Sequence, residues 1–377
     1  MDPLTLLIFI LAFGGMVIIH EFGHYIAARW SGIEVEEFGI GLPTPGAITL
    51  FTWQGTRFTL NWLPLGGFVR PKGENDPTVE GGLAAASPWK RLFVLVAGPA
   101  MNLITAVIIF SLIINISGGI ITVQPGSENP LVLITNVTAG SPAEAAGLQV
   151  GDVLLRGGGQ PITNSLDIRD VVTANVDQPV DFVVERSGQQ LTLTITPRYN
   201  AEEGRPLIGI EYCDGCAFQP ITTVGENLRA SLRYTGLQVY QLVTLPVNLI
   251  RGAVDPEMGR VVGLKGIYDI MSQSVAKDVE ASQAPTTTTT TSNPYNRPVQ
   301  TLFLIAALSI SLGVFNLFPF PALDGGRIIF VLPELLFRRR VPHQFENLVH
   351  GLGMALLLAF MLYVNVRDFV DPINLPK

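Results

Sequence analysis

The chain has 377 residues, of which 48% are hydrophobic and 15% are charged. Soluble globular domains usually carry about 25% charged residues, and the mean hydropathy of this chain is +0.39. These values argue against an ordinary soluble enzyme and against a disordered chain. The net charge of −7 makes nucleic acid an unfavourable partner. The two cysteines, Cys213 and Cys216, are too few for a disulfide scaffold.

Four apolar stretches are long enough to cross a bilayer, which takes about 20 residues. They cover residues 4–28, 92–116, 299–318 and 348–366. The first stretch has no basic leading segment and no small-residue cleavage site, so we expect it to stay in the mature protein. The middle third of the chain is polar and strand-like, which excludes a purely helical membrane bundle.

Lysine and arginine near the ends of the spans predict the orientation of the chain. They gather in the loops 30–90 and 320–346, whereas the N-terminal tail has none. We therefore expect these two loops on the cytoplasmic side. Both termini and the long insert, residues 117–298, are then expected outside the cytoplasm.

The first loop contains a predicted β-hairpin. Alternating residues over 48–53 and 58–62 flank the turn signal Gln54-Gly55. Both faces of this hairpin are apolar, which is unusual for an aqueous loop. Two interpretations stay open: the hairpin dips into the membrane against the helices, or it packs on the bundle as an ordinary hairpin.

The insert begins with the pattern of a small mixed domain over residues 131–197. The motif Ser141-Pro142-Ala143-Glu144 is a capping box with proline at the first helical position, and a second helix is expected from Asn164 or Ser165 to Val172. Strands are predicted over 131–137, 153–155, 180–185 and 190–196.

Two further segments complete the insert. Residues 224–250 have helical periodicity with few charges, so this helix either lies on the membrane surface or packs against the small domain. Residues 284–298 contain six consecutive threonines, Thr286 to Thr291, between two prolines. This composition predicts an extended linker into the third span.

The strongest functional signal is His20-Glu21-Phe22-Gly23-His24, an H-E-x-x-H motif inside the first span. Residues four apart share one face of a helix, so two imidazoles can bind one Zn²⁺ while the glutamate acts as general base. With only four histidines in the chain, composition alone gives this pattern on the order of one chance in 500. Ionisable side chains at membrane depth are costly and mark functional sites.

Two histidines leave a catalytic zinc one protein ligand short. The candidate third ligand is Asp324, which follows two prolines at the end of the third span and precedes Gly325-Gly326. Prolines break the helix, and a broken helix at membrane depth is tolerated where it lines a cavity. The predicted orientation places Asp324 and both histidines toward the cytoplasmic side, so they can meet.

These motifs resemble the site-2 protease family of intramembrane zinc metalloproteases, in particular the bacterial regulator-of-sigma-E type. The resemblance covers essentially the whole chain, and residues 316–326 match the N-x-x-P-x-P-x-L-D-G-G motif. Three further stretches look like family elements: Leu65-Gly66-Gly67-Phe68-Val69 with Gly73-Glu74, Gly98-Pro99-Ala100-Met101-Asn102, and the PDZ-like Ser141-Pro142-Ala143 with Gly151-Asp152.

The resemblance implies that His20, His24 and Asp324 hold Zn²⁺ and that Glu21 activates water. It also implies that Asn316 steadies the substrate backbone or the oxyanion, and that the hairpin offers an edge strand to an unwound substrate. Such pairing would replace the backbone hydrogen bonds that a transmembrane helix loses when it becomes extended. The remaining candidate substrate-binding residues are Pro319, Pro321, Gly66 and Gly67.

The expected fold is a polytopic α-helical membrane protein with about four transmembrane helices, a membrane-associated β-hairpin and one inserted extracytoplasmic PDZ-like α+β domain. The spans are assigned to residues 1–30, 91–116, 299–326 and 347–367. The other segments are the cytoplasmic loop 31–90, the PDZ-like domain 117–200, the amphipathic region and linker 201–298, the loop 327–346 and the tail 368–377.

The expected activity is hydrolysis of peptide bonds within or near the transmembrane segments of single-span proteins, such as an anti-sigma factor or a signal-peptide remnant. The expected location is a bacterial-type plasma (inner) membrane, and the expected partners are those substrates, the lipid bilayer and a peptide bound by the PDZ domain. The alternative is a non-catalytic adaptor or receptor that uses its PDZ domain. A transporter is a third class, disfavoured because the four spans show no internal repeats.

Other features leave more than one interpretation open. Cys213 and Cys216 form a C-x-x-C that is a small-loop disulfide, a pair of free thiols, or a metal or redox site. Gly263-Leu264-Lys265-Gly266-Ile267 stands where many relatives have G-P-[IV]-G-I, which puts any role of that stretch in doubt. His343 and His350 are interpreted as interfacial residues.

Overall fold

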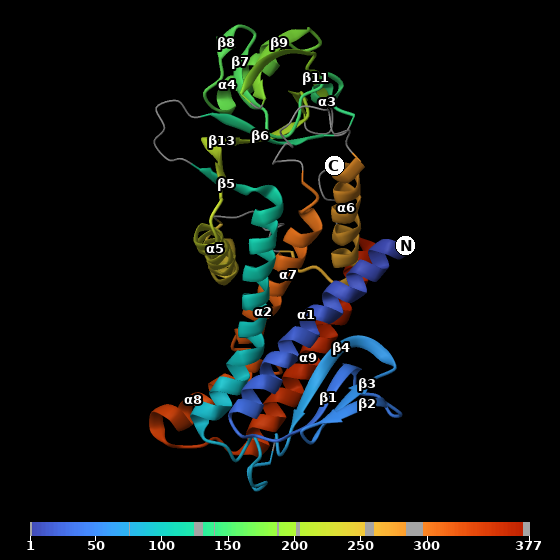
Figure 1. Cartoon of the computed structure of the whole chain (residues 1–377), viewed down its shortest axis with the longest axis vertical. Coiled ribbons are helices and arrows are strands. Elements are labelled where there is room, and N and C mark those ends of the chain that lie inside the picture. Colours follow the sequence, from blue (N-terminus) through green and yellow to red (C-terminus); the bar gives the residue numbers. More distant parts are fainter. Residues whose placement is uncertain are drawn as a thin grey trace. The chain divides into compact units, whose positions relative to one another are not determined.

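The computed structural model describes residues 2–74, 76–123, 131–138, 140–186, 188–200, 204–252, 260–283 and 297–371. The predicted threonine linker, Thr286 to Thr291, lies outside these residues. The chain forms two compact units, drawn together in Figure 1. The first comprises residues 1–111, 231–276 and 300–373, and the second comprises residues 112–230, 277–299 and 374–377.

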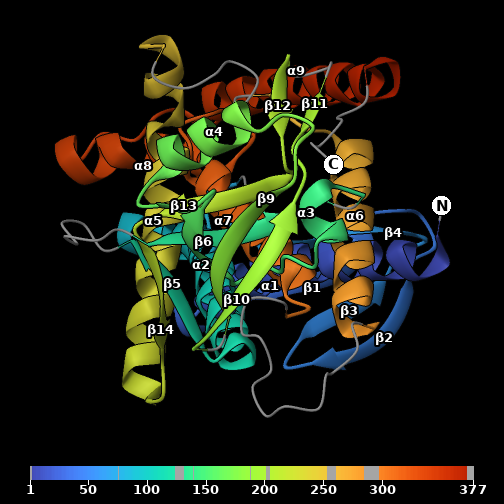
Figure 2. The ribbon, with the colours of Figure 1, turned by 90° about the horizontal axis from the view of Figure 1, so that it is seen from above.

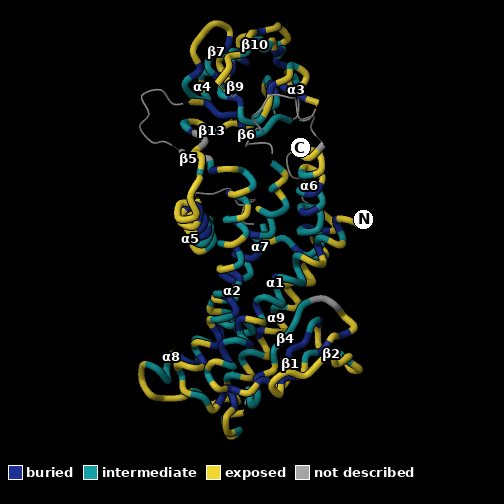
Figure 3. The backbone as a smooth tube through the Cα atoms, in the orientation of Figure 1, coloured by how far each residue is buried: buried dark blue, intermediate teal, exposed yellow. Residues whose placement is uncertain are grey.

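In the described part of the chain, four helices are long and apolar enough to cross a membrane, and each corresponds to one of the four predicted spans. They are α1 (Pro3–Trp30), α2 (Pro88–Ser117), α7 (Gln300–Leu317) and α9 (His343–Val370). Between 11% and 33% of the most apolar part of each helix is buried inside the protein. In the burial colours of Figure 3, the commonest class on α1 is intermediate, and most residues of α9 are exposed. Apolar surface of this extent is suited to lipid rather than to water.

A four-stranded sheet packs beside α1 (Figure 1). The predicted hairpin forms its β2 and β3, with Gln54 and Gly55 at positive φ in the turn. Tyr25 of α1 packs edge-on against the rings of Phe38 and Phe58. Two strands that the sequence analysis did not predict complete the sheet. Its order is β2 (Ile48–Trp53), β3 (Thr56–Leu60), β1 (Val35–Leu42) and β4 (Leu63–Pro71).

The third spanning helix ends near residue 318, where its predicted apolar stretch ends, and does not continue to the end of the assigned segment 299–326. Helix α7 stops at Leu317, and after a short break α8 (Asp324–Phe337) begins within the segment that was assigned as the end of span 299–326 and the loop 327–346. Pro319 and Pro321 have no backbone N–H to continue the helix. A Cβ atom on Gly325 would collide with the backbone of residues 317 and 318, so the chain doubles back tightly at this point.

Helix α6 (Leu264–Gln283) was not predicted, although its first residues were noted as an atypical motif. Its Met271 packs with Phe9 of α1, while Asp368 of α9 accepts hydrogen bonds from the backbone N–H groups of Gly263 (2.7 Å) and Gly266 (3.2 Å). Asp368 is 1% exposed. A carboxylate at a helix N-terminus satisfies free N–H groups and complements the helix dipole.

Helix α5 (Val224–Ile250) is the predicted amphipathic helix. Its Tyr234 stacks on Phe110 of α2. Apolar side chains at several positions remain exposed, among them Leu228, Leu232, Tyr240 and Val243. The helix therefore contacts a spanning helix on one side and keeps an apolar surface on another, and its placement at the membrane surface stays a prediction.

The second unit contains a six-stranded sheet, in which β8 (Gln160–Pro161) pairs with β7 beside the main strand order. Two short helices, α3 (Pro142–Ala145) and α4 (Ser165–Ala174), accompany it. The strand order is β10 (Gln189–Ile195), β9 (Val180–Arg186), β7 (Val153–Gly157), β6 (Val132–Val137) and β13 (Ile210–Asp214). Figure 2 shows β9 and β10 side by side. Because β13 belongs to this sheet, the PDZ-like domain extends beyond residue 200, where the sequence analysis ended it.

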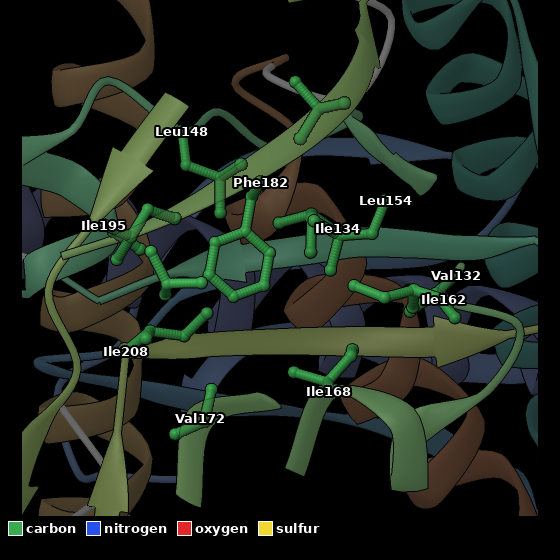
Figure 4. Close-up of a cluster of buried hydrophobic side chains, with 13 residues drawn as sticks. Val132, Ile134, Leu148, Leu154, Ile162, Ile168, Val172, Phe182, Ile195 and Ile208 are labelled. Atoms are coloured by element: carbon green, nitrogen blue, oxygen red, sulfur yellow. The ribbon is translucent and has the colours of Figure 1, made fainter. Parts of the chain in front are cut away.

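The core of this domain is apolar and closed (Figure 4). Phe182, Leu154, Ile134 and Ile195 are fully buried, and they come from four different strands. Asn164 caps α4, as the sequence indicated, and Asp167 completes the capping box. Hydrogen bonds from the backbone and side chain of Thr163 lower the pKa of Asp167.

Two short two-stranded ribbons lie in the second unit beside the larger sheet. β5 (Gly119–Val123) pairs with β14 (Cys216–Pro220), and β11 (Arg198–Asn200) pairs with β12 (Arg205–Leu207). Cys213 at the end of the PDZ-like sheet and Cys216 at the start of β14 are joined by a disulfide. Of the open alternatives for this C-x-x-C, the structure has the small-loop disulfide.

The contact between Asp368 and α6 gives a first prediction. The substitution Asp368→Ala removes the acceptor for two buried N–H groups, and each charged hydrogen bond contributes about 1.5–3 kcal/mol. We expect a lower midpoint of thermal unfolding for the purified protein in detergent. Asp368→Asn keeps one acceptor oxygen and should lose less. Equal midpoints for wild type and Asp368→Ala would show that this contact does not hold α6.

Candidate metal centre

Two histidines meet on one face of α1. His20 and His24 are one helical turn apart, and their Nε2 atoms lie 3.2 Å from each other. Their rings are nearly perpendicular, and the side chains are 8% and 12% exposed. Two imidazole nitrogens that point at one place from a buried helix face can share a bound cation.

The broken helix supplies the third group. The Oδ2 atom of Asp324, in the first turn of α8, lies 3.2 Å from His20 Nε2 and 3.4 Å from His24 Nε2. Bonds of about 2.0–2.2 Å at tetrahedral angles place ligand atoms about 3.3–3.5 Å apart. The three atoms therefore fit one zinc ion, and the polar neighbours of the buried Asp324 Oδ2 atom are the two imidazole nitrogens.

Helix α2 supports both histidines from one of its faces. His24 Nδ1 lies 2.8 Å from the carbonyl oxygen of Val94, and His20 Nδ1 lies 3.2 Å from Nδ2 of the buried Asn102. Gly98 lies midway between these two residues along α2. A Cβ atom there would be 2.6 Å from Cε1 of His24, so only glycine allows the two helices to approach this closely.

Strand β4 runs along the same side of α1 and faces Glu21. A Cβ atom on Gly67 would be 3.4 Å from Cγ of Glu21. The general-base candidate is thus held between the two histidines on one side and a strand backbone on the other.

The other predicted residues have different surroundings. Asn316 is half-buried and its amide donates to the carbonyl oxygen of Leu312, one turn back in α7. Pro321 packs against Gly353 of α9, where a Cβ atom would meet it, and Pro319 is exposed. Gly66 has φ +93° beside Leu42. Pro321 therefore helps to support the turn that carries Asp324. Among the described residues, the hydrogen bond of Asn316 goes to Leu312 and not to the three ligand atoms.

His350 supports the backbone just before Asp324, a role that the sequence analysis did not predict. Its Nδ1 accepts a hydrogen bond from the backbone N–H of Ala322, a residue held at φ +80° two positions before Asp324. A non-glycine residue at positive φ is strained and needs support from its surroundings. The motif around Ala322 does not indicate a positive φ at this residue. The sequence therefore could not identify His350 as its hydrogen-bond partner.

Two ion pairs join α8 to neighbouring segments. Arg327 Nη1 lies 2.6 Å from Glu74 Oε1, and Arg91 of α2 pairs with Glu334. They join α8 to the segment after β4 and to α2. The turn that carries Asp324 is therefore fixed by α9, α2 and the first loop together.

Comparisons with known proteins identify the family of the chain and several relatives. Residues 8–360 match the model of peptidase family M50. A Clostridium perfringens protein named as a zinc metalloprotease is 31% identical to this chain. The match covers 97% of this chain and 98% of that protein. The Caulobacter vibrioides metalloprotease MmpA is 28% identical over 97% of this chain and 94% of its own. The solved PDZ domain of a Listeria monocytogenes SdrC-like protein covers 24% of this chain at 21% identity, with a TM-score of 0.21.

Four apolar helices and a cluster of two histidines and an aspartate define a multi-pass membrane protein of the metalloprotease class. The chain belongs to peptidase family M50, the site-2 protease family. It is a zinc metalloprotease, as the sequence analysis predicted, and its cofactor is Zn²⁺.

The close approach of α2 to the ring of His24 at Gly98 gives a prediction about zinc binding. This prediction does not depend on the substrate. Gly98→Ala places a methyl group against the ring of His24 and should lower the zinc content of the purified protein at least tenfold. The control is Gly14→Ala, because a Cβ atom at Gly14 meets nothing within 4 Å. Zinc is measured per mole of protein by atomic emission. Full zinc occupancy in Gly98→Ala would contradict the proximity of α2 and His24.

Proposed function

We propose that the chain is an intramembrane endopeptidase that cleaves single-span membrane proteins within or near their transmembrane segments. His20, His24 and Asp324 hold the zinc ion, and Glu21 is the catalytic acid–base. The observation that carries the proposal is the convergence of three ligand atoms within 3.4 Å of one another. Two of them belong to α1, a helix apolar enough to cross a membrane, and the third begins α8, directly after the spanning helix α7. Regulated proteolysis of an anti-sigma factor or a signal-peptide remnant is the biological setting.

The zinc ion, when bound, supplies a Lewis acid that polarises the scissile carbonyl and lowers the pKa of water. The carboxylate of Glu21 accepts a proton from the attacking water and returns it to the leaving amine. The carbonyl oxygen of Val94 on α2 orients the imidazole of His24. We assign to Asn316 the role of steadying the oxyanion or the substrate backbone, for which its amide would leave Leu312.

The substrate is proposed to bind as an extended strand along β4. The sequence analysis expected the hairpin to offer this edge strand. We propose β4 instead, because β4 is an edge strand that passes Glu21 at Gly67, whereas the hairpin strand β2 lies at the opposite edge. An edge strand can replace the internal hydrogen bonds that a substrate helix loses on unwinding. Gly66 and Gly67 lie in β4, and the small size of glycine leaves the backbone there open to a partner.

The location and orientation remain those of the sequence analysis. We propose a bacterial-type plasma membrane, with the metal centre toward the cytoplasm and the PDZ-like domain and both termini outside it. The arginines and lysines of the loops support this orientation. The PDZ-like domain would bind a peptide or limit the size of substrates that approach.

The role of Glu21 is tested by cleavage of a tagged single-span protein in cells. Glu21→Gln keeps the size of the side chain but cannot accept the proton, so we expect cleavage to fall by about 10²–10⁴ with zinc content unchanged. Glu36→Gln is the control, because Glu36 is an exposed carboxylate on β1 of the same unit. Cleavage by Glu21→Gln at the wild-type rate would overturn the protease mechanism and favour an adaptor.

A further inference from the structure

The two imidazoles of the metal centre need opposite roles at their two nitrogens. Both Nε2 atoms point toward Asp324 Oδ2, so a metal ion there binds each ring through Nε2. A neutral imidazole that gives its Nε2 lone pair to a metal carries its proton on Nδ1. Each Nδ1–H group is then a buried donor that requires an acceptor.

The acceptor for the Nδ1–H group of His24 is a backbone carbonyl. This Nδ1 atom lies 2.8 Å from the carbonyl oxygen of Val94, and a carbonyl oxygen can only accept. This contact alone fixes the tautomer of His24 that leaves Nε2 free for metal. The ring of His20 faces a side chain instead, and that side chain has both a donor and an acceptor.

Asn102 is fully buried, and its Nδ2 lies 3.2 Å from Nδ1 of His20. In this orientation a donor faces the nitrogen that must itself carry a proton when metal is bound. The other end of the same amide, Oδ1, is buried with no hydrogen-bond donor facing it. A half-turn about the Cβ–Cγ bond of Asn102 exchanges the positions of Nδ2 and Oδ1. The acceptor Oδ1 then faces the Nδ1–H group of His20.

We propose that Asn102 is a positioning residue for the zinc site: its Oδ1 accepts the Nδ1–H of His20 and so directs Nε2 of that ring to the metal. The inference rests on the zinc site proposed above. It makes the supports of the two histidines equivalent, since each Nδ1–H donates to an oxygen of α2. Partners of this kind orient metal ligands and raise their basicity.

The fold holds Asn102 firmly enough for this role. Residues 94, 98 and 102 are four apart, so the two supports and the glycine between them share one face of α2. On the other side, Ser309 of α7 donates to the backbone carbonyl of Asn102 at 2.9 Å. A Cβ atom on Gly313 of α7 would lie 3.4 Å from Cβ of Asn102, so α7 packs closely against this residue.

The test measures zinc affinity of the full-length protein in detergent by competition with a chromogenic chelator. Asn102→Leu keeps the approximate volume but removes the acceptor, and we expect its affinity to fall 10- to 100-fold. Asn102→Asp restores an acceptor oxygen and should bind zinc within a few-fold of wild type. Equal affinity of Asn102→Leu and wild type would overturn the proposal, as would Asn102→Asp binding no better than Asn102→Leu.

His20→Ala and Asp324→Ala are measured in parallel. If both keep the wild-type affinity, the zinc site itself is wrong. If both lose zinc while Asn102→Leu keeps it, only the role of Asn102 is wrong.

A second measurement uses the wild-type chain and does not depend on a variant that folds. The protein has four histidines, so ¹⁵N-histidine labelling gives few resonances. With zinc bound, His20 is expected to show a protonated Nδ1 and a metal-bound Nε2. A zinc-bound His20 with the proton on Nε2 would contradict the proposal.

Discussion

The metal centre depends on the meeting of two segments that are about 300 residues apart in the chain. His20 and His24 are placed by one turn of α1, but Asp324 reaches them only because α7 stops at Leu317 and α8 starts anew at Asp324. A continuous helix would carry the aspartate further along its own axis. The break, the tight glycine turn and the support of Ala322 by His350 all serve this one approach.

Helix α2 is the second element that the site requires. It offers a carbonyl at Val94, no side chain at Gly98 and a buried amide at Asn102, all on one face. Each of these features is unfavourable or useless for lipid contact. Together they form a surface against which two imidazoles fit, and they explain why an apolar span contains a glycine and a buried asparagine.

The sequence predicted the pairing of His20 with His24 and the four apolar helices because both depend on local patterns: the spacing of histidines on a helix, and the length of apolar runs. It also predicted that Asp324 would lie near the histidines, and the structure brings the three side chains together. The hairpin turn at Gln54-Gly55 and the cap at Asn164 were also local and were found. Strands β1 and β4, helix α6 and the role of His350 were not, because each depends on a distant partner. Strand β13 lies past the expected domain end for the same reason, since its partner β6 is about 75 residues away.

The central claim is that two imidazoles and a carboxylate hold the zinc ion. X-ray absorption at the zinc K-edge of the purified, zinc-loaded protein tests it most directly, because it reports the type, number and distance of the nearest ligand atoms. The account predicts nitrogen and oxygen neighbours at about 2.0–2.2 Å with the outer-shell signal of two imidazoles. Sulfur neighbours at about 2.3 Å, which only Cys213 and Cys216 or the methionines supply, or a single imidazole, would contradict it.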